Sequence, residues 1–132
     1  MLMKVATWFG IILLVAGILG FIGALTPNGM LFGVFAVDGL HNTVHLLTGV
    51  VAVWVGLTSE RASRLFFQIF AVIYGVITLI GFVAGNNPLL GVMAHNWADV
   101  WLHLAITAFS AYMGFVYRVS YRKAHHPADR PH

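Results

Sequence analysis

Four apolar stretches, each about as long as a lipid bilayer is thick, constrain the fold of this chain more than any other feature. They cover residues 5–25, 37–57, 65–84 and 98–117. A helix of about 20 apolar residues spans the ~30 Å hydrocarbon core of a bilayer. Only 8% of the 132 residues are charged, whereas a soluble domain carries roughly 25%. The sequence therefore predicts an all-α, four-helix transmembrane bundle within the lipid bilayer over residues 1–117, followed by a basic cytoplasmic tail over residues 118–132.

The basic residues predict how the bundle is oriented in the membrane. All seven precede the first stretch, separate the second from the third, or follow the fourth: Lys4, Arg61, Arg64, Arg118, Arg122, Lys123 and Arg130. In a four-helix protein these three places share one side, and basic residues mark the cytoplasmic side. We therefore expect a multi-pass protein of the bacterial inner membrane with both termini in the cytoplasm and anionic lipid at its basic face. Basic residues confined to helix ends do not predict nucleic-acid binding.

Similar residues recur in the two halves of the chain. His45-Leu46-Leu47 resembles His103-Leu104-Ala105, and a Gly-Phe pair at 20–21 resembles another at 81–82. Each half is a helical hairpin with an even number of crossings, so both halves have the same orientation. The pattern predicts two duplicated helical hairpins related by a pseudo-two-fold axis along the membrane normal. Small residues at four-residue spacing, such as Ala16 and Gly20, allow close helix contacts, either within one bundle or in a homo-oligomer.

Polar residues within the predicted helices gather at the start of the second and of the fourth. They are Asp38, His41, Asn42, His45, His95, Asn96, Asp99 and His103. At 100° per residue each set lies on one helix face, and ionisable groups inside a membrane usually face the bundle interior. We expect the two faces to meet in the outer half of the bundle. There His41, His45, Asp99 and His103 would converge, with Asp38 and His95 nearer the outer mouth.

Two of these segments carry a resemblance to a known family. Residues 35–49 read FAVDGLHNTVHLLTG and residues 96–104 read NWADVWLHL. They resemble the HNxVHLLxG and ADNWLHL motifs of small bacterial four-helix membrane proteins catalogued as domain of unknown function 4383, with Val100 where that family commonly has Asn. The resemblance implies a four-helix membrane fold over nearly the whole chain and supports the two histidine-bearing positions. It implies no established activity.

Four functions remain open for the polar cluster. The first is a structural hydrogen-bond and ion-pair network in a membrane protein or a subunit of a membrane complex. The second is a site for a divalent transition metal (Zn, Fe, Mn or Cu), with His41, His45, Asp99 and His103 as ligands and the other four polar residues around them. Haem bound by His45 and His103 is the third, and a proton or ion path is the fourth.

No catalytic residues are predicted from the sequence. Nothing in it marks an activated nucleophile, a phosphate-binding loop or a dinucleotide fingerprint. The absence of cysteine excludes thiol catalysis and thiolate metal sites. These observations favour a membrane protein without enzymatic activity, while catalysis by a water molecule that a bound metal activates stays open.

Overall fold

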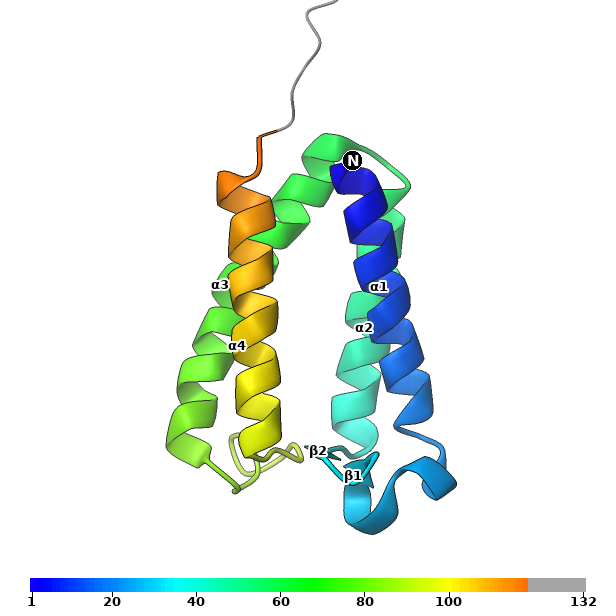
Figure 1. The fold of residues 1–132 in the computed structure, drawn as a ribbon, viewed down its shortest axis with the longest axis vertical. Coiled ribbons are helices and arrows are strands. Elements are labelled where there is room, and N and C mark those ends of the chain that lie inside the picture. Colours follow the sequence, from blue (N-terminus) through cyan, green and yellow to red (C-terminus); the bar gives the residue numbers. More distant parts are fainter. Residues whose placement is uncertain (119–132) are drawn as a thin grey trace, which may run out of the picture.

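The computed structural model describes residues 1–118, and it is helical except for one short hairpin and the connecting turns. The four long helices are α1 (Leu2–Leu19), α2 (Gly39–Gly56), α3 (Glu60–Ala84) and α4 (Trp97–Ala111), shown in Figure 1. A π-helical turn, Tyr112–Val116, extends α4. The predicted all-α fold with four helices is confirmed. The tail that begins at Arg118 lies almost wholly outside the described residues, as do the predictions for Arg122, Lys123 and Arg130.

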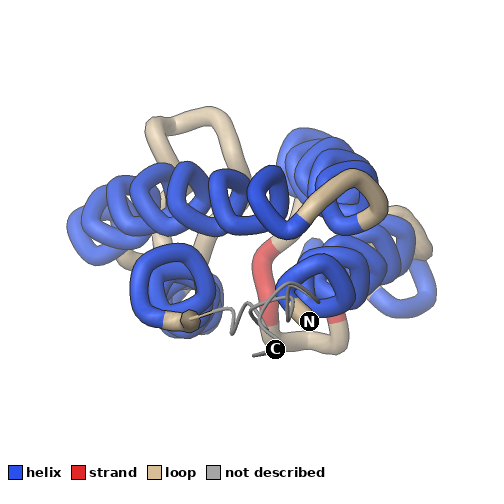
Figure 2. The backbone as a smooth tube through the Cα atoms, turned by 90° about the horizontal axis from the view of Figure 1, so that it is seen from above, coloured by secondary structure: helices blue, strands red, loops and turns tan. Residues whose placement is uncertain are grey.

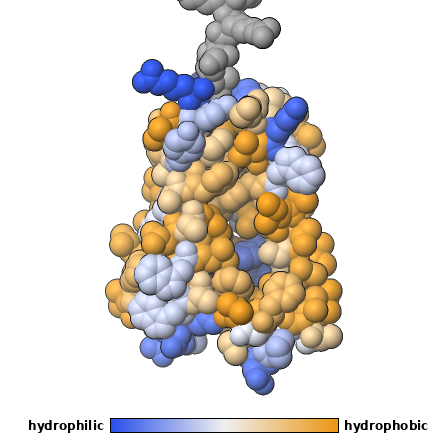
Figure 3. Space-filling view, in the orientation of Figure 1, coloured by the Kyte–Doolittle hydropathy of each residue, from blue (hydrophilic) through white to orange (hydrophobic). Residues whose placement is uncertain are grey.

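Three of the four helices are long and apolar enough to cross a membrane: α1, α3 and α4 with its π-helical extension. The 18-residue α2 is not among them, because His41, Asn42 and His45 occupy its first two turns and lower its mean hydropathy. Large apolar side chains such as Trp54 and Val72 are exposed on the outside of the bundle. Figure 3 shows this apolar surface along the helices and hydrophilic residues at the two ends, a distribution suited to contact with lipid.

Two helix boundaries differ from the prediction. The first helix ends at Leu19 rather than at residue 25, and a 3-10 turn, Gly23–Leu25, follows it. At this end of α1, Gly20 lies directly on the side chain of Asn42, where a Cβ atom would overlap the amide. The third helix begins at Glu60 instead of residue 65. Its start is stabilised by Ser59, whose Oγ accepts a hydrogen bond from the Ala62 amide at 3.0 Å.

The helices form two tight hairpins, α1 with α2 and α3 with α4. A Cβ atom at Gly10 would lie 2.7 Å from the Gly49 carbonyl oxygen, so the backbones of α1 and α2 touch where only glycine fits. Figures 1 and 2 show the two hairpins side by side, nearest each other at the α2–α3 turn. The core at that end contains Leu2, Phe67 and Met113, all 5% exposed or less.

The two long loops lie together at the opposite end (Figure 1). In the first, β1 (Met30–Leu31) pairs with β2 (Phe35–Ala36) in antiparallel fashion. The second contains a single antiparallel bridge between Leu89 and Met93. Each turn contains a bulky residue and then a glycine, both with positive φ: Phe32 and Gly33 in the first, Leu90 and Gly91 in the second. Corresponding residues of the two turns are separated by the same 58 positions as His45 and His103.

Candidate metal centre

The site begins at the first turns of α2 and α4, which are built alike. Asp38 and Asn96 are the N-cap residues, and both have a φ of −147°. The carboxylate of Asp38 accepts a hydrogen bond from the His41 amide at 2.8 Å, and the Asn96 side chain accepts one from the Asp99 amide at 3.1 Å. Asp99 completes a capping box, because its carboxylate accepts the Asn96 amide at 3.0 Å. These polar side chains therefore stabilise the starts of the two helices.

The same cap residues also join the two hairpins. The second carboxylate oxygen of Asp38 accepts a hydrogen bond from the Ala94 amide at 2.7 Å. The Ala94 carbonyl in turn accepts one from Nδ1 of His41 at 3.1 Å. In the reverse direction, the Asn96 amide group donates to the Val34 carbonyl at 2.8 Å. Both the amide and the carbonyl of Ala94 are therefore hydrogen-bonded to side chains at the start of α2.

Three histidines converge beneath these caps. His41, His45 and His103 are buried, and each offers one nitrogen atom that lies within 4.8 Å of those of the other two. The ring centroids of His41 and His45 are 4.7 Å apart, and those of His41 and His103 are 5.9 Å apart. The structure therefore brings together three of the four residues predicted from the sequence as ligands.

The hydrogen bonds of these rings do not satisfy all of their nitrogens. A carbonyl oxygen only accepts, so Nδ1 of His41 donates its proton to Ala94. Nε2 of His45 and Nδ1 of His103 are buried without a hydrogen-bond partner among the described residues. A buried polar atom without a partner costs about 1–3 kcal/mol. Two such atoms in rings of one three-histidine cluster indicate a site that a cation can satisfy.

Asp99, the fourth predicted ligand, is 1% exposed but does not belong to the converging set. Together with His41 and His45 it borders a cavity of about 250 Å³ against α1 and the β1–β2 loop. Figure 3 shows a hollow on this face with hydrophilic residues inside it. Asp99 is therefore near the three histidines, while its capping bond holds one oxygen toward Asn96.

His95 lies on the other side of His103, with the two ring centroids 6.2 Å apart. Its Nδ1 donates to the Gly85 carbonyl at 3.0 Å, and its Nε2 is buried without a partner among the described residues. Burial lowers the pKa of His95 below its ordinary value, against the opposing effect of hydrogen bonds to the backbone of Gly85 and Asn87. Asn42, the remaining predicted site residue, packs against Gly20 and away from the three converging nitrogens.

The arrangement suits a borderline metal ion bound by nitrogen. Zinc binds imidazole nitrogen at about 2.0–2.1 Å, which places two tetrahedral ligands about 3.4 Å apart. The nitrogens that the three histidines offer lie within 4.8 Å of one another, so a tetrahedral zinc ion would draw them together by up to about 1.4 Å. Metal-binding histidines typically donate their other N–H to a carbonyl or carboxylate, as His41 does to Ala94. An imidazole set favours zinc or copper over manganese, which prefers oxygen ligands.

Two further groups at this centre could not be inferred from the sequence. The ring of Tyr74 in α3 packs edge-on against His103, with centroids 5.4 Å apart. The backbone of Ala94 binds both Asp38 and His41. A tyrosine in the middle of an apolar helix stands out in the sequence, but nothing there indicates that its ring packs on His103. A backbone group such as that of Ala94 leaves no signal in the sequence.

Comparison with known proteins gives one match. A family model described as Domain of unknown function (DUF4383) matches residues 4–116. No curated protein and no solved structure matches the chain.

Proposed function

This chain belongs to the DUF4383 family, and we propose that it is a membrane protein whose three-histidine centre binds one divalent transition metal ion. One observation carries the proposal. Three buried imidazoles from two hairpins offer nitrogens within 4.8 Å of one another, and two of these rings have a nitrogen without a partner within residues 1–118. Buried polar groups in folded proteins are nearly always paired. A metal ion at this position pairs them.

The proposed ligands are His41, His45 and His103. Asp99 borders the same cavity and is the candidate for a fourth ligand, directly or through a water molecule. Zinc and copper are the preferred ions, and iron and manganese follow because they favour additional oxygen ligands. Asp38, Asn42 and Asn96 hold the helices around the centre in place, and His95 lies beside His103 outside the converging set.

The proposal includes the way the protein lies in the membrane. We infer four spans, α2 among them, with the α2–α3 turn and both termini on the cytoplasmic side of a bacterial inner membrane, because Lys4, Arg61 and Arg64 lie at that end. We also infer that the hairpins arose by duplication. Support comes from the cap residues, the loop turns and the histidines, which recur at a constant separation of 58 residues.

Metal analysis of the purified full-length protein tests the function. We expect about one zinc or copper ion per chain by mass spectrometry after equilibration with each metal. The double variant His45→Ala/His103→Ala should retain none, and His95→Gln, which changes a neighbouring imidazole outside the converging set, should retain the wild-type amount. Equal metal in the double variant and the wild type would contradict the proposal. A Soret band in the absorption spectrum would instead indicate haem.

A second function is favoured by a separate observation. Asp38, Asn96 and Asp99 all take part in caps or in contacts between the hairpins. These contacts fit a purely structural polar network, in a protein that acts as a subunit of a larger membrane complex or as a homo-oligomer. In that case the protein binds no metal, and chelator leaves its thermal unfolding unchanged.

A further inference from the structure

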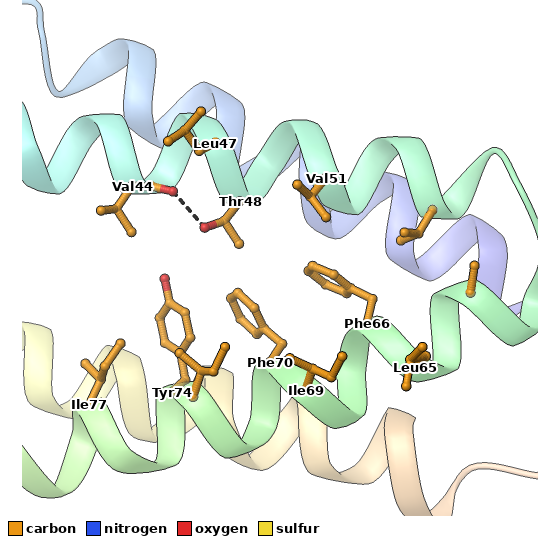
Figure 4. A pocket seen from close by; sticks show the side chains of 13 residues that line it. Val44, Leu47, Thr48, Val51, Leu65, Phe66, Ile69, Phe70, Tyr74 and Ile77 are labelled. Carbon is orange, nitrogen blue, oxygen red and sulfur yellow. Dashed lines mark hydrogen bonds between the residues drawn. The ribbon is translucent and has the colours of Figure 1, made fainter.

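A second cavity, larger than the one at the histidine centre, opens between α2 and α3 and takes no part in the proposed metal site. Its volume is about 500 Å³. Figure 4 shows Leu47 and Val51 of α2 on one wall and Phe66, Ile69 and Phe70 of α3 on the other. We refer to this cavity as the α2–α3 groove. It lies between the two hairpins, on helices whose outer surface is apolar.

The α2–α3 groove has the length and chemistry of a binding site for a hydrocarbon chain. Its α3 wall runs from Ala62 to Ile77, roughly 22 Å at 1.5 Å per residue. One leaflet of the hydrocarbon core is only ~15 Å deep, so the groove can hold a whole acyl chain. Among its lining residues only Thr48 and Tyr74 carry a hydroxyl, and that of Thr48 donates to the Val44 carbonyl at 2.7 Å.

The residues of the groove do not suit another transmembrane helix. Helices pack closely in membranes through small residues, and the described glycines of this kind lie inside the hairpins. Gly10 and Gly49 bring α1 against α2, and Gly114 lies against the backbone of Gln68 in α3. The groove walls instead consist mainly of leucine, isoleucine, valine and phenylalanine. A flexible chain fills such a surface without backbone contact.

A positive charge lies at the end of the groove next to the α2–α3 turn. Arg61 is exposed and precedes Leu65, a groove residue, by one helical turn on the same face. Within residues 1–118 it forms no ion pair, since its neighbour Glu60 binds the amino group of Met1 at 2.8 Å. The other arginine of this turn, Arg64, donates to the carbonyls of Gly114 and Tyr117. Arg61 is therefore available to an anion at the membrane surface.

We propose that the α2–α3 groove binds one acyl chain of an anionic glycerophospholipid whose phosphate contacts Arg61. The charge of Arg61 complements the anionic headgroup, and the groove that extends from it takes the chain. The end of the groove away from the α2–α3 turn is lined by Tyr74 and Ile77. Because the Tyr74 ring packs on His103, the end of the bound chain lies one side chain away from the histidine cluster.

Native mass spectrometry of the full-length protein tests this binding. The protein is equilibrated in mixed micelles with palmitoyl-oleoyl phosphatidylglycerol or phosphatidylcholine, and the lipid retained after release from detergent is counted. We expect about one retained phosphatidylglycerol per chain. Arg61→Gln should reduce the preference for phosphatidylglycerol over phosphatidylcholine about fivefold, the contribution of one basic residue near an anionic surface.

Two substitutions fill the groove from opposite walls, Ile69→Trp on α3 and Val51→Trp on α2. Both should abolish retention of either lipid. Val72→Trp is the matched control, because Val72 lies on α3 but is 61% exposed and outside the groove; it should retain lipid as the wild type does. Circular dichroism establishes that each variant is helical. If a groove variant does not fold, the test rests on Arg61→Gln, whose groove is intact. An unchanged preference for phosphatidylglycerol in that variant would then contradict the proposal.

Three results would overturn the proposal. The first is a wild-type protein that retains no lipid, and the second is equal retention by Ile69→Trp and Val72→Trp. The third is a lipid-free dimer that Ile69→Trp dissociates, which would assign the groove to contact between two copies of the chain. None of these results depends on whether the histidine centre binds metal.

Discussion

The space between the two hairpins is filled in opposite ways at its two ends. Near the α2–α3 turn, Phe9 of α1 contacts four other phenylalanines, with ring centroids 5.4–6.3 Å apart: Phe66, Phe67, Phe70 and Phe109. Near the long loops, the corresponding space contains His41, His45 and His103. The aromatic end is complete by itself, because edge-to-face and stacked rings satisfy one another. The histidine end is not, because some of its nitrogens have no hydrogen-bond partner in the described part of the chain.

This difference in packing indicates that the aromatic end and the histidine end have different roles. An apolar substitution at the histidine end would remove the buried unpaired nitrogens, each of which costs about 1–3 kcal/mol. A chain selected only for stability has no need of them. We therefore expect that the aromatic end determines stability and that the histidine end responds to a ligand. The following predictions separate the two.

The largest effect is expected at the aromatic end. Phe67 is fully buried and contacts the rings of Phe9, Phe66 and Phe109. Phe67→Ala leaves a cavity and should lower the free energy of unfolding by about 3–5 kcal/mol, measured by denaturant titration in detergent with circular dichroism. Metal content should not change. Loss of the metal from a folded Phe67→Ala variant would show that the two ends are coupled. Phe109→Ala, at a residue that is 42% exposed, should cost less.

The next effect is expected at the histidine end, on addition of metal. Zinc at 100 times its dissociation constant should stabilise the wild type by about 2.7 kcal/mol. The same stabilisation should occur in Phe67→Ala, because that substitution leaves the ligands unchanged. In His103→Ala it should be absent, since one of three ligands is missing. Differential scanning calorimetry with and without zinc measures all three, and an equal shift in His103→Ala would exclude this residue as a ligand.

A smaller effect is expected from the cap of α2. Asp38→Ala removes the N-cap and leaves the Ala94 amide without its acceptor. The free energy of unfolding should decrease by about 2 kcal/mol, a sum of a lost cap and a partly buried unpaired amide. Thermal unfolding in detergent provides the measurement. Asp38→Asn keeps an acceptor oxygen for the cap but sets an NH2 group against the Ala94 amide, so it should recover only the share of the loss that belongs to the cap. Full recovery would show that the bond to Ala94 contributes nothing.

The smallest effect is expected from the equivalent cap of α4. Asn96→Ala also removes an N-cap, but the contact that Asn96 makes with the Val34 carbonyl is exposed to solvent. Water can replace that contact, so the loss should be about 1 kcal/mol. Chemical denaturation of Asn96→Ala and Asp38→Ala in parallel tests the ranking. An Asn96→Ala variant less stable than Asp38→Ala would contradict the proposed roles of the two caps.

The fold could be predicted from the sequence because membrane helices leave a strong signal. Twenty apolar residues between turn-forming clusters predicted the four helices, and the predicted end of α1 and start of α3 were wrong. At the early end of α1, Gly20 packs directly on Asn42 of α2. That contact joins residues 22 positions apart, so no local pattern contains it.

The candidate site could be predicted in part. Helical periodicity identified His41, His45 and His103, because residues at the same face of equivalent helices meet when the helices do. Asp99 fits the same periodicity but forms a capping box, since the N3 position of a helix is where a carboxylate reaches the backbone. The pairing of Asp38 with Ala94 depends on how two loops meet, which periodicity does not specify.

The double attachment of Ala94 links the histidine centre to the surface of the protein. Nδ1 of His41 holds the Ala94 carbonyl while Asp38 holds its amide. A movement of the His41 ring must therefore either shift the loop that precedes α4 or break its hydrogen bond. That loop also carries His95 and leads directly into the cap of α4. The rotation of one imidazole would in this way be transmitted to the loop that leads into α4.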